Sequence, residues 1–530
     1  ITASAGTSNF RAGVNAGNSI ESGGNYNVVV GDEAGTAITT GDNNTAVGYN
    51  AGTAVTTGTS NTAIGFKSLD ANTTASNNTA IGKSALGSNT DGASNTAVGF
   101  STLASNTTGA NNVAVGRESL GNNTTASNNT ALGYAALLTN TTAINNTAVG
   151  SESLTANTSG AQNTAVGVSS MKATTTGGDN TALGFNSLVV NTTGTGNTAL
   201  GRSTLDANTT ASNNTAVGSN ALGANTTGAS NTATGRQALN ANTTGANNTA
   251  HGSRALLTNT TAAGNTAVGD DALLLNTTGA NNVAVGYAAL DANTTGQRNT
   301  AVGQQAMGFN TTGDFNTALG RDSLHKNTTA DNNVAVGYGA LYENTTGAQN
   351  TAVGQAAGDA LTVGSYNIAL GQNALSSDTQ GSQSVAIGSS ALFTQNFTSA
   401  TATNNTAVGH GAGAAVTTGT ACTLIGSLAG DSITTGSFAT YIGQEAGGAT
   451  TTGTYNTFIG TGTIAGTGNF GAGSLVTTGS KNAFLGGYNG NQNGLDLRTA
   501  SNNIVLSDGD GTPFYWGRSS GTHVHSTVTA

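Results

Sequence analysis

A 17-residue repeat runs through almost the whole chain and constrains its fold more than any other feature. The segment NTAIGFKSLDANTTASN begins at Asn61, and equivalent segments follow at Asn78 and Asn95. The step holds without a slip from Asn27 to Ser384, which gives 22 registers, and seven more divergent registers bring the total to 29. A short, fixed period indicates stacked structural units that each contact only their neighbours, rather than a globular domain.

Composition supports this interpretation, because the chain lacks the side chains of a thick core. It contains 79 Gly, 5% aromatic and 7% charged residues, against roughly 25% charged residues in a typical soluble domain. Strict periodicity argues against a disordered low-complexity chain, which needs no register. The 14 Lys and Arg form no basic stripe, and no apolar run approaches the ~20 residues of a membrane helix. We therefore expect neither nucleic-acid binding nor membrane insertion.

The consensus N-T-A-V-G-x-x-A-L-x-x-N-T-T-G-x-N predicts strands and turns. Positions 2 and 4 carry β-branched or bulky residues, and alternation along a strand places them on one face and position 3 on the other. We expect position 4 to face the interior. Gly at position 5 suits a corner with positive φ, and N-T-T-G is turn chemistry. The pattern predicts an all-β, parallel β-solenoid (β-roll) of 17-residue coils, each with two very short strands and two turns.

Two repeat subtypes point to one shared, narrow interior. Most copies carry Leu at position 9 and Asn at position 12, such as Leu69 with Asn72. Other copies carry Gly at position 9 and an aliphatic residue at position 12, such as Gly52 with Val55. When one position loses its apolar group the other gains one, which is expected if both side chains point inward. Equivalent Asn residues are expected to stack into ladders along the solenoid.

Position 3 is Ala in 22 successive registers, from Ala46 to Ala407. If this outer position simply faced water, polar residues should appear there. We therefore expect a tight contact with an identical chain, since most soluble oligomers are closed and homomeric. The predicted contact residues include Ala63, Ala80, Ala97, Ala131 and Ala148. The same position enlarges towards the C-terminus, to Leu424, Tyr441, Phe458 and Phe484, where we expect wider packing.

Departures from the period divide the chain into four predicted regions. Residues 1–26 form a degenerate N-terminal repeat, and residues 27–388 form the regular shaft. Residues 389–486 contain irregular coils with insertions, and residues 487–530 form a C-terminal β cap or tip. No Ser/His/Asp or paired-carboxylate arrangement recurs in any of them, so we expect a protein that is not an enzyme.

The N-[ST]-[AV]-[VI]-G repeats resemble the head of trimeric autotransporter adhesins, a left-handed parallel β-roll, and similar shafts of bacteriophage tail fibres. The adhesin-head repeat is shorter, and this chain carries an additional N-T-T-G turn. The resemblance covers about Gly31 to Gly486 and implies a homotrimeric fibre, intertwined or side by side. No membrane-anchor barrel follows the repeats in this sequence, which favours the phage form.

The segment Gly521-Thr522-His523-Val524-His525 resembles the G-x-H-x-H motif of long phage tail-fibre tips. In those tips three chains bring both histidines to the axis, where six imidazoles bind iron. The resemblance implies that His523 and His525 hold iron or another transition-metal ion at the trimer axis, for which imidazole is a suitable ligand. The alternatives for this segment are an exposed terminal strand or the start of a fusion scar.

Aromatic and basic residues gather in the predicted tip, which holds the only Trp of the chain. Tyr515, Trp516 and Arg518 are candidates for binding a receptor, because aromatic faces pack on sugar rings. The alternative is that these residues pack the core of the cap. The expected partner is a glycan or protein receptor on the surface of a host cell.

The sequence therefore predicts a structural fibre that attaches to a host or surface, most simply a phage tail fibre on the virion surface. One alternative is a bacterial surface adhesin or a self-assembling extracellular filament. A third hypothesis is an ice-binding solenoid, because N-T-T turns would stack Thr residues in rows.

Overall fold

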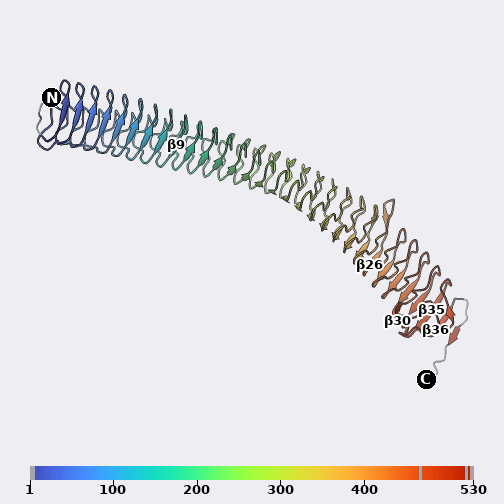
Figure 1. Cartoon of the computed structure of the whole chain (residues 1–530). Helices are drawn as coiled ribbons and strands as arrows, with labels where there is room; N and C mark the ends of the chain where they lie inside the picture. Colours follow the sequence, from blue (N-terminus) through green and yellow to red (C-terminus); the bar gives the residue numbers. More distant parts are fainter. Residues whose placement is uncertain (1–5, 465–467, 520–522, 526–530) are drawn as a thin grey trace. The chain divides into compact units, whose positions relative to one another are not determined.

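The computed structural model describes residues 6–464, 468–519 and 523–525, and of residues 462–464, 468–470 and 523–525 it describes the backbone alone. These residues form strands and turns, with no helix among them. They belong to two compact units, Ile1–Gly264 and Asn265–Ala530. In each unit the chain winds as a parallel β-solenoid, with about 29 coils of 17 residues in all, which confirms the predicted fold class (Figure 1).

In the first unit every coil contributes one three-residue strand, and neighbouring strands pair in parallel, so that Thr62 lies opposite Thr79. The strands are β1 (Phe10–Ala12), β2 (Val28–Val30), β3 (Thr45–Val47), β4 (Thr62–Ile64), β5 (Thr79–Ile81), β6 (Thr96–Val98), β7 (Val113–Val115), β8 (Thr130–Leu132), β9 (Thr147–Val149), β10 (Thr164–Val166), β11 (Thr181–Leu183), β12 (Thr198–Leu200), β13 (Thr215–Val217), β14 (Thr232–Thr234) and β15 (Thr249–His251).

The second unit continues the same pattern and adds short strands in its insertions. Its parallel series is β16 (Thr266–Val268), β17 (Val283–Val285), β18 (Thr300–Val302), β19 (Thr317–Leu319), β20 (Val334–Val336), β21 (Thr351–Val353), β22 (Ile368–Leu370), β24 (Val385–Ile387), β26 (Thr406–Val408), β27 (Thr423–Ile425), β28 (Thr440–Ile442), β29 (Thr457–Ile459), β32 (Ala483–Leu485) and β35 (Asn503–Ser507). The remaining strands are the parallel pair β23 (Gly381–Ser382) and β25 (Thr401–Ala402), the antiparallel hairpins β30 (Thr461–Ile464) with β31 (Gly468–Gly471) and β33 (Asn491–Gln492) with β34 (Leu495–Asp496), and the terminal β36 (Pro513–Arg518) and β37 (His523–His525).

The interior face of each strand is the opposite of the one predicted. The central Ala of each strand is buried, as at Ala80 with none of its surface exposed, whereas Ile64 at position 4 is 38% exposed and Leu132 is 45% exposed. The prediction that the Ala stripe contacts a neighbouring chain is therefore wrong, because these side chains lie inside their own solenoid: Ala63, Ala80, Ala97, Ala131 and Ala148.

The width of the interior explains why Ala lies inside. Position 9 packs directly on position 3, since a Cβ at Gly52 would lie 3.6 Å from the Cβ of Ala46 and 3.8 Å from that of Ala63 in the next coil. In most coils a fully buried Leu, such as Leu69, occupies position 9. A methyl group fits against this Leu, whereas a second branched chain would overpack the interior.

The predicted compensation between positions 9 and 12 is confirmed. Leu69 and Asn72 are both fully buried, and in the other subtype Val55 is buried beside Gly52. A Cβ at Gly52 would lie 3.7 Å from Cγ2 of Val55, within ordinary van der Waals contact. The two positions therefore fill one shared volume, as the sequence indicates.

Two ladders of buried Asn residues run along the stack, also as predicted. At position 1, the main-chain N–H of Asn44 donates to Oδ1 of Asn27 over 2.9 Å, and Nδ2 of Asn44 donates to the carbonyl of Gly58 over 2.9 Å. At position 12, Nδ2 of Asn89 donates to Oδ1 of Asn72 over 2.9 Å. These bonds satisfy buried polar groups that would otherwise cost about 1–3 kcal/mol each.

Each regular coil contains one strand, not the two that were predicted. The residues at positions 7, 9 and 17 have positive φ, for example 54° at Lys67, 53° at Leu69 and 63° at Asn77. This left-handed conformation bends the chain where a second strand was expected, although main-chain bonds such as Leu69 N–H to the carbonyl of Ala85 still join the coils. The expected corner at position 5 is confirmed: Gly65 has φ 132°, and its Cβ would lie 2.7 Å from the carbonyl carbon of Gly82.

The coils near the C-terminus fill the interior with aromatic rings. The rings of Tyr441 and Phe458 stack with centroids 4.8 Å apart, and Phe458 and Phe484 repeat this spacing. Gly occupies position 9 here, and a Cβ at Gly473 would lie 2.5 Å from a ring carbon of Phe458. The larger residues at position 3 therefore compensate for Gly at position 9, because the strand side chain fills the interior volume that the turn leaves empty.

Candidate binding site in the C-terminal cap

The parallel stack ends in a small antiparallel cap. Strand β35 pairs in parallel with β32, with Val505 opposite Phe484, and so continues the sheet of the solenoid. Strand β36 then pairs antiparallel with β35, with Trp516 opposite Val505, and β37 pairs antiparallel with β36. The change from parallel to antiparallel pairing covers the edge of the last coil, which would otherwise expose unpaired main-chain groups.

A tight turn at Asp508–Gly511 reverses the chain into the cap. The N–H of Gly511 donates to the carbonyl of Asp508 over 3.1 Å, and the N–H of Thr512 donates to the Asp508 carboxylate over 2.7 Å. Pro513 follows as the first residue of β36, a position at which a strand tolerates the loss of a donor. The turn sets the register that places the aromatic residues of β36 beside the preceding hairpin.

The cap contains a hollow of about 280 Å³ with aromatic walls. It lies between the β33–β34 hairpin and β36, and its lining consists of Asn493, Gly494, Leu495, Thr512, Pro513, Phe514, Tyr515 and Trp516. None of these described lining residues is charged, and the polar side chains are an amide, a hydroxyl and the Tyr phenol. Apolar walls with few polar groups suit the face of a neutral sugar ring or a similarly amphipathic group.

Two side chains, the buried Tyr488 and the part-exposed Gln492, hold the hairpin that forms one wall of the hollow. The hydroxyl of Tyr488 donates to the carbonyl of Leu495 over 2.7 Å, and burial raises the pKa of this phenol. Nε2 of Gln492 donates to the carbonyl of Asp510 over 2.7 Å and so ties the hairpin to the turn before β36. The wall is positioned by the interior of the solenoid, because Tyr488 itself packs edge-on against Phe484 with centroids 5.1 Å apart.

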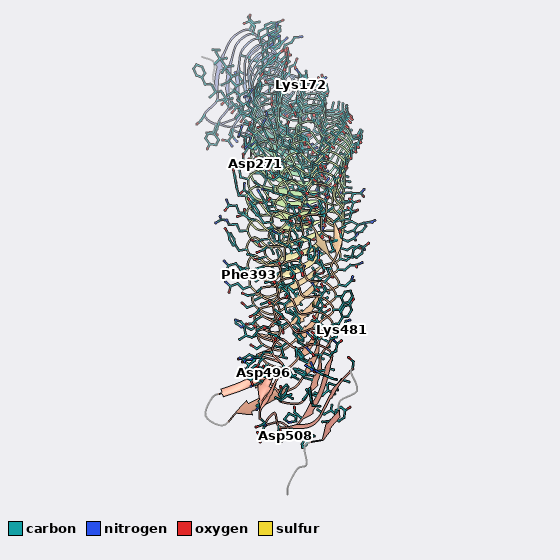
Figure 2. All side chains as sticks on the ribbon, turned by 90° about the vertical axis from the view of Figure 1, so that its right-hand side faces the viewer. Lys172, Asp271, Phe393, Lys481, Asp496 and Asp508 are labelled. Atoms are coloured by element: carbon teal, nitrogen blue, oxygen red, sulfur yellow. The ribbon has the colours of Figure 1, made fainter. Side chains whose placement is uncertain are left out.

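A second hollow of about 280 Å³ lies beside the first and is basic. Its lining includes Lys481, Asn502, Tyr515 and Arg518, and Figure 2 shows Lys481 projecting outward from the coils. Nε of Arg518 donates to Oδ1 of Asn503 over 3.3 Å. The two cations suit an anionic group on a ligand, next to the uncharged first hollow.

The structure brings the three predicted receptor-binding residues onto one strand. Tyr515 lines both hollows, Trp516 lines the first and Arg518 the second. The guanidinium of Arg518 lies 5.9 Å from the centroid of the Trp516 ring, within the range of a cation–π contact. The indole nitrogen of Trp516 is shielded from solvent and donates to no described residue.

Sequence reasoning missed the contribution of the β33–β34 hairpin to the first hollow and of Lys481 to the second. A signal for the hairpin existed, because paired residues Ala483 and Ile504 are 21 positions apart instead of 17. This lengthened coil directly precedes the strand that leads into the tip, and that order would have identified Asn493–Leu495 as neighbours of the cap. Lys481 carried no such signal, since it lies in an ordinary turn position.

The predicted metal ligands His523 and His525 have side chains outside the described residues. Their backbone belongs to β37, opposite Gly517 and Tyr515 of β36. Within the described part of the chain, no group of three or more His, Cys, Asp or Glu residues could hold a metal ion. The transition-metal hypothesis thus stays a prediction.

Comparison with protein-family models, with curated proteins and with solved structures finds no match to this chain. Among the described residues, no helix has the length and hydropathy that a membrane span requires.

Proposed function

We propose that this chain is a structural fibre protein that attaches a particle or cell to a surface, most simply as a phage tail fibre. The observation that supports this function best is the combination of regularly stacked coils with a closed cap that carries a hollow. A solenoid of repeated coils can hold a binding site away from the particle or cell that carries it, and stability arises at every contact between coils. The described residues show no cluster of catalytic side chains at either hollow, so the proposed role is attachment rather than chemistry.

We infer that three identical chains pack through the outer faces of their parallel sheets. In the first unit this face presents Thr at position 2 and exposed Val, Ile or Leu at position 4, such as Leu132 and Leu183, each 45% exposed. A three-residue strand spans about 10 Å and strands lie about 4.8 Å apart. Fifteen strands therefore offer roughly 700 Å². A closed trimer divides this face between two partners, at about 350 Å² each, so the strands of the second unit must add contact area to reach the about 800 Å² that each partner buries in a standard interface.

The oligomer is tested with the double variant Leu132→Lys/Leu183→Lys. We expect light scattering after size exclusion to give a trimer for the parent chain and a monomer for this variant, because two charges per chain would be buried in the interface. Leu275→Lys is the matched control, since Leu275 is 46% exposed but lies in a turn. A parent chain that elutes as a monomer, or a variant that stays trimeric, would refute this arrangement.

The proposed receptor contact is the hollow walled by Tyr515 and Trp516, with a surface glycan as the ligand. Attachment of the labelled chain to host cells should fall at least about tenfold for Trp516→Ala, since aromatic anchors carry much of a binding energy. Tyr26→Ala, which removes a 59% exposed Tyr of the first unit, should bind normally. Unchanged attachment by a folded Trp516→Ala variant would exclude this hollow, and hydrogen exchange of β36 reports whether the cap stays folded.

The same experiments separate the tail fibre from a self-assembling extracellular filament. A closed trimer of constant mass favours the fibre, whereas protomers that join end to end with increasing concentration favour the filament. Iron at the trimer axis remains a proposal for His523 and His525, and metal analysis of the purified trimer tests it.

A further inference from the structure

The outer surface of the first unit carries a row of aromatic and basic side chains at position 6. The row consists of Tyr49, Phe66, Lys83, Phe100, Arg117 and Tyr134, one from each of six successive coils. Each aromatic member is between 44% and 51% exposed, and the Arg117 side chain is 62% exposed. We call this row the position-6 ridge.

The members of the position-6 ridge contact one another in an unbroken series. The rings of Tyr49 and Phe66 stack with centroids 5.7 Å apart. Nζ of Lys83 lies 5.7 Å from the centroids of both Phe66 and Phe100. Cζ of Arg117 lies 5.8 Å from the centroids of both Phe100 and Tyr134. The contacts order long side chains that would otherwise be mobile, so the ridge is preorganised.

These contacts determine which part of each ring faces solvent. Neighbours along the stack cover both faces of the Phe66 and Phe100 rings and one face of the Tyr49 and Tyr134 rings at the ends of the ridge. These faces carry the negative part of the aromatic quadrupole. The positive ring edges and the cationic heads are left to point outward. Lys67, at position 7 of the second coil, adds a third cation 5.9 Å from the centroid of Phe66.

The ridge therefore differs in charge from the chain as a whole, which has a net charge of −10. Between Tyr49 and Tyr134 the only acidic residue at positions 6 and 7 is Glu118, which forms an ion pair with Arg117 at 3.0 Å. The six coils extend over about 24 Å at a strand spacing of about 4.8 Å. An extended polyanion that lies along the solenoid matches this shape and charge.

We propose that the position-6 ridge binds an anionic polysaccharide, one whose sugars carry carboxylate or phosphate groups. The anionic groups contact Lys67, Lys83 and Arg117, while the sugar rings lie against the outward-facing edges of the aromatic rings between the cations. This inference deepens the attachment function proposed above, because it adds a lateral contact along the shaft to the contact at the cap. A single-stranded nucleic acid shares the charge but is disfavoured, since its successive bases stack on ring faces and the faces of the inner rings, Phe66 and Phe100, are covered.

The test measures binding of the purified full chain to polygalacturonate, with dextran as the neutral polysaccharide and an oligothymidylate as the nucleic acid. We expect polygalacturonate to bind, to weaken as salt rises, and to weaken about tenfold or more in Lys83→Ser/Arg117→Ser. Ser occupies position 6 naturally at Ser151 and Ser219, so the coil tolerates the change. Glu118→Gln should strengthen binding a few-fold, because it releases Arg117.

Arg236→Ser is the matched control, because Arg236 also lies at position 6 but is flanked by Ser219 and Ser253 in the adjacent coils. It should change affinity less than about twofold. Equal binding of dextran, tighter binding of oligothymidylate, or equal losses in Arg236→Ser and the double variant would each overturn the proposal. The assay is independent of the cap: if cell attachment fails while polygalacturonate binds, the proposed function fails and this inference stands.

Discussion

In the coil that begins at Asn180, the strand supplies the short Ala182 and the turn supplies the long Leu188, both fully buried. In the coil that begins at Ala439, the strand supplies the long Tyr441 and the turn supplies Gly447. The backbone is the same in both, with φ of 53° at Leu188 and 64° at Gly447. The two coils show that each coil has a fixed interior volume to fill, and that either the strand or the turn can supply the larger side chain.

The exchange also changes the cost of the turn. A left-handed conformation costs an ordinary residue roughly 1–2 kcal/mol, and the regular coils accept this cost at Leu188 because the side chain fills the interior. Gly447 adopts the same conformation without that penalty. The aromatic coils thus combine a relaxed turn with stacked rings, immediately before the cap that must hold its shape.

The largest effect is expected in a coil that carries a long side chain both on the strand and in the turn. Gly447→Leu gives the aromatic coil the turn of a regular coil, and the new side chain would collide with the ring of Tyr441. We expect a local loss of about 3 kcal/mol, as for severe overpacking, measured by native-state hydrogen exchange of β28 and β29. Adding Tyr441→Ala recreates the regular pair and should restore most of the loss. If the double variant is no more stable than the single one, the two positions do not share a volume.

The polar side of the interior should be nearly as sensitive. Asn123 at position 12 donates to Oδ1 of Asn106 over 2.8 Å and accepts from Nδ2 of Asn140 over 3.0 Å. Asn123→Ala interrupts this ladder and leaves a void, so we expect a local cost of about 2 kcal/mol. The adjacent, exposed Asn122 provides the control, and Asn122→Ala should change stability by less than about 0.5 kcal/mol. Equal effects on hydrogen exchange at the two sites would show that the ladder contributes nothing.

The C-terminal coils interrupt the other ladder, and restoring it should stabilise them. Cys422 occupies position 1, where its N–H donates to Oδ1 of Asn405 over 2.9 Å, and burial raises the pKa of its thiol. Ala439 occupies position 1 of the next coil. Cys422→Asn would replace the weak sulfur acceptor that the N–H of Ala439 now contacts by an amide oxygen, and we expect a gain of about 1 kcal/mol. Slower exchange of that N–H is the readout, and Cys422→Ala, which offers no acceptor, should not slow it.

The smallest effect concerns position 10, which lies outside the interior in both kinds of coil. Burial holds the pKa of the Asp206 and Asp431 carboxyls above its usual value. The folded state therefore prefers the protonated carboxyl. The charged carboxylate destabilises the folded state above the raised folded pKa, and this destabilisation is lost below the pKa of the unfolded chain, near 3.9. Asp206→Asn and Asp431→Asn should each stabilise by a few tenths of a kcal/mol at pH 7. Neither should stabilise at pH 3, and hydrogen exchange at the two pH values checks this.

Similar results at the two sites would confirm that position 10 is insensitive to how the interior is divided. A gain at Asp431 with none at Asp206 would contradict this, and would show that a coil with Gly at position 9, here Gly430, differs from the regular coils on its outside as well.

Much of the fold could be predicted because each repeat shows the same pattern of residue types and so tests the same structural interpretation again. The exchange between Leu69 with Asn72 and Gly52 with Val55 located the interior, since only side chains that share a volume compensate one another. The strand face that points into the solenoid was predicted wrongly, because period-2 alternation separates two faces but does not indicate which of them is internal. A better signal was present: position 4 accepts Thr234 and His251, whereas position 3 stays Ala in the same coils.

The candidate site could be predicted only in part. Tyr515, Trp516 and Arg518 were recognisable as aromatic and basic residues outside the repeat, and they do lie on one strand beside two hollows. The wall formed by Asn493–Leu495 depends on a hairpin held by Tyr488 and Gln492. These hydrogen bonds join residues that share no repeat position, so periodicity contains no information about them.

The sequence by itself determined the period, the corner at position 5, the buried pair at positions 9 and 12 and the stacking of Asn residues, because each is repeated in most coils and has one local cause. Only the tertiary structure decided which strand face is internal, how the aromatic coils divide their volume, and how Lys83 and Arg117 come to lie between rings. These features depend on the distance across a coil and on contacts between coils. Both arise only when the left-handed turns close each coil and bring residues 17 positions apart into register.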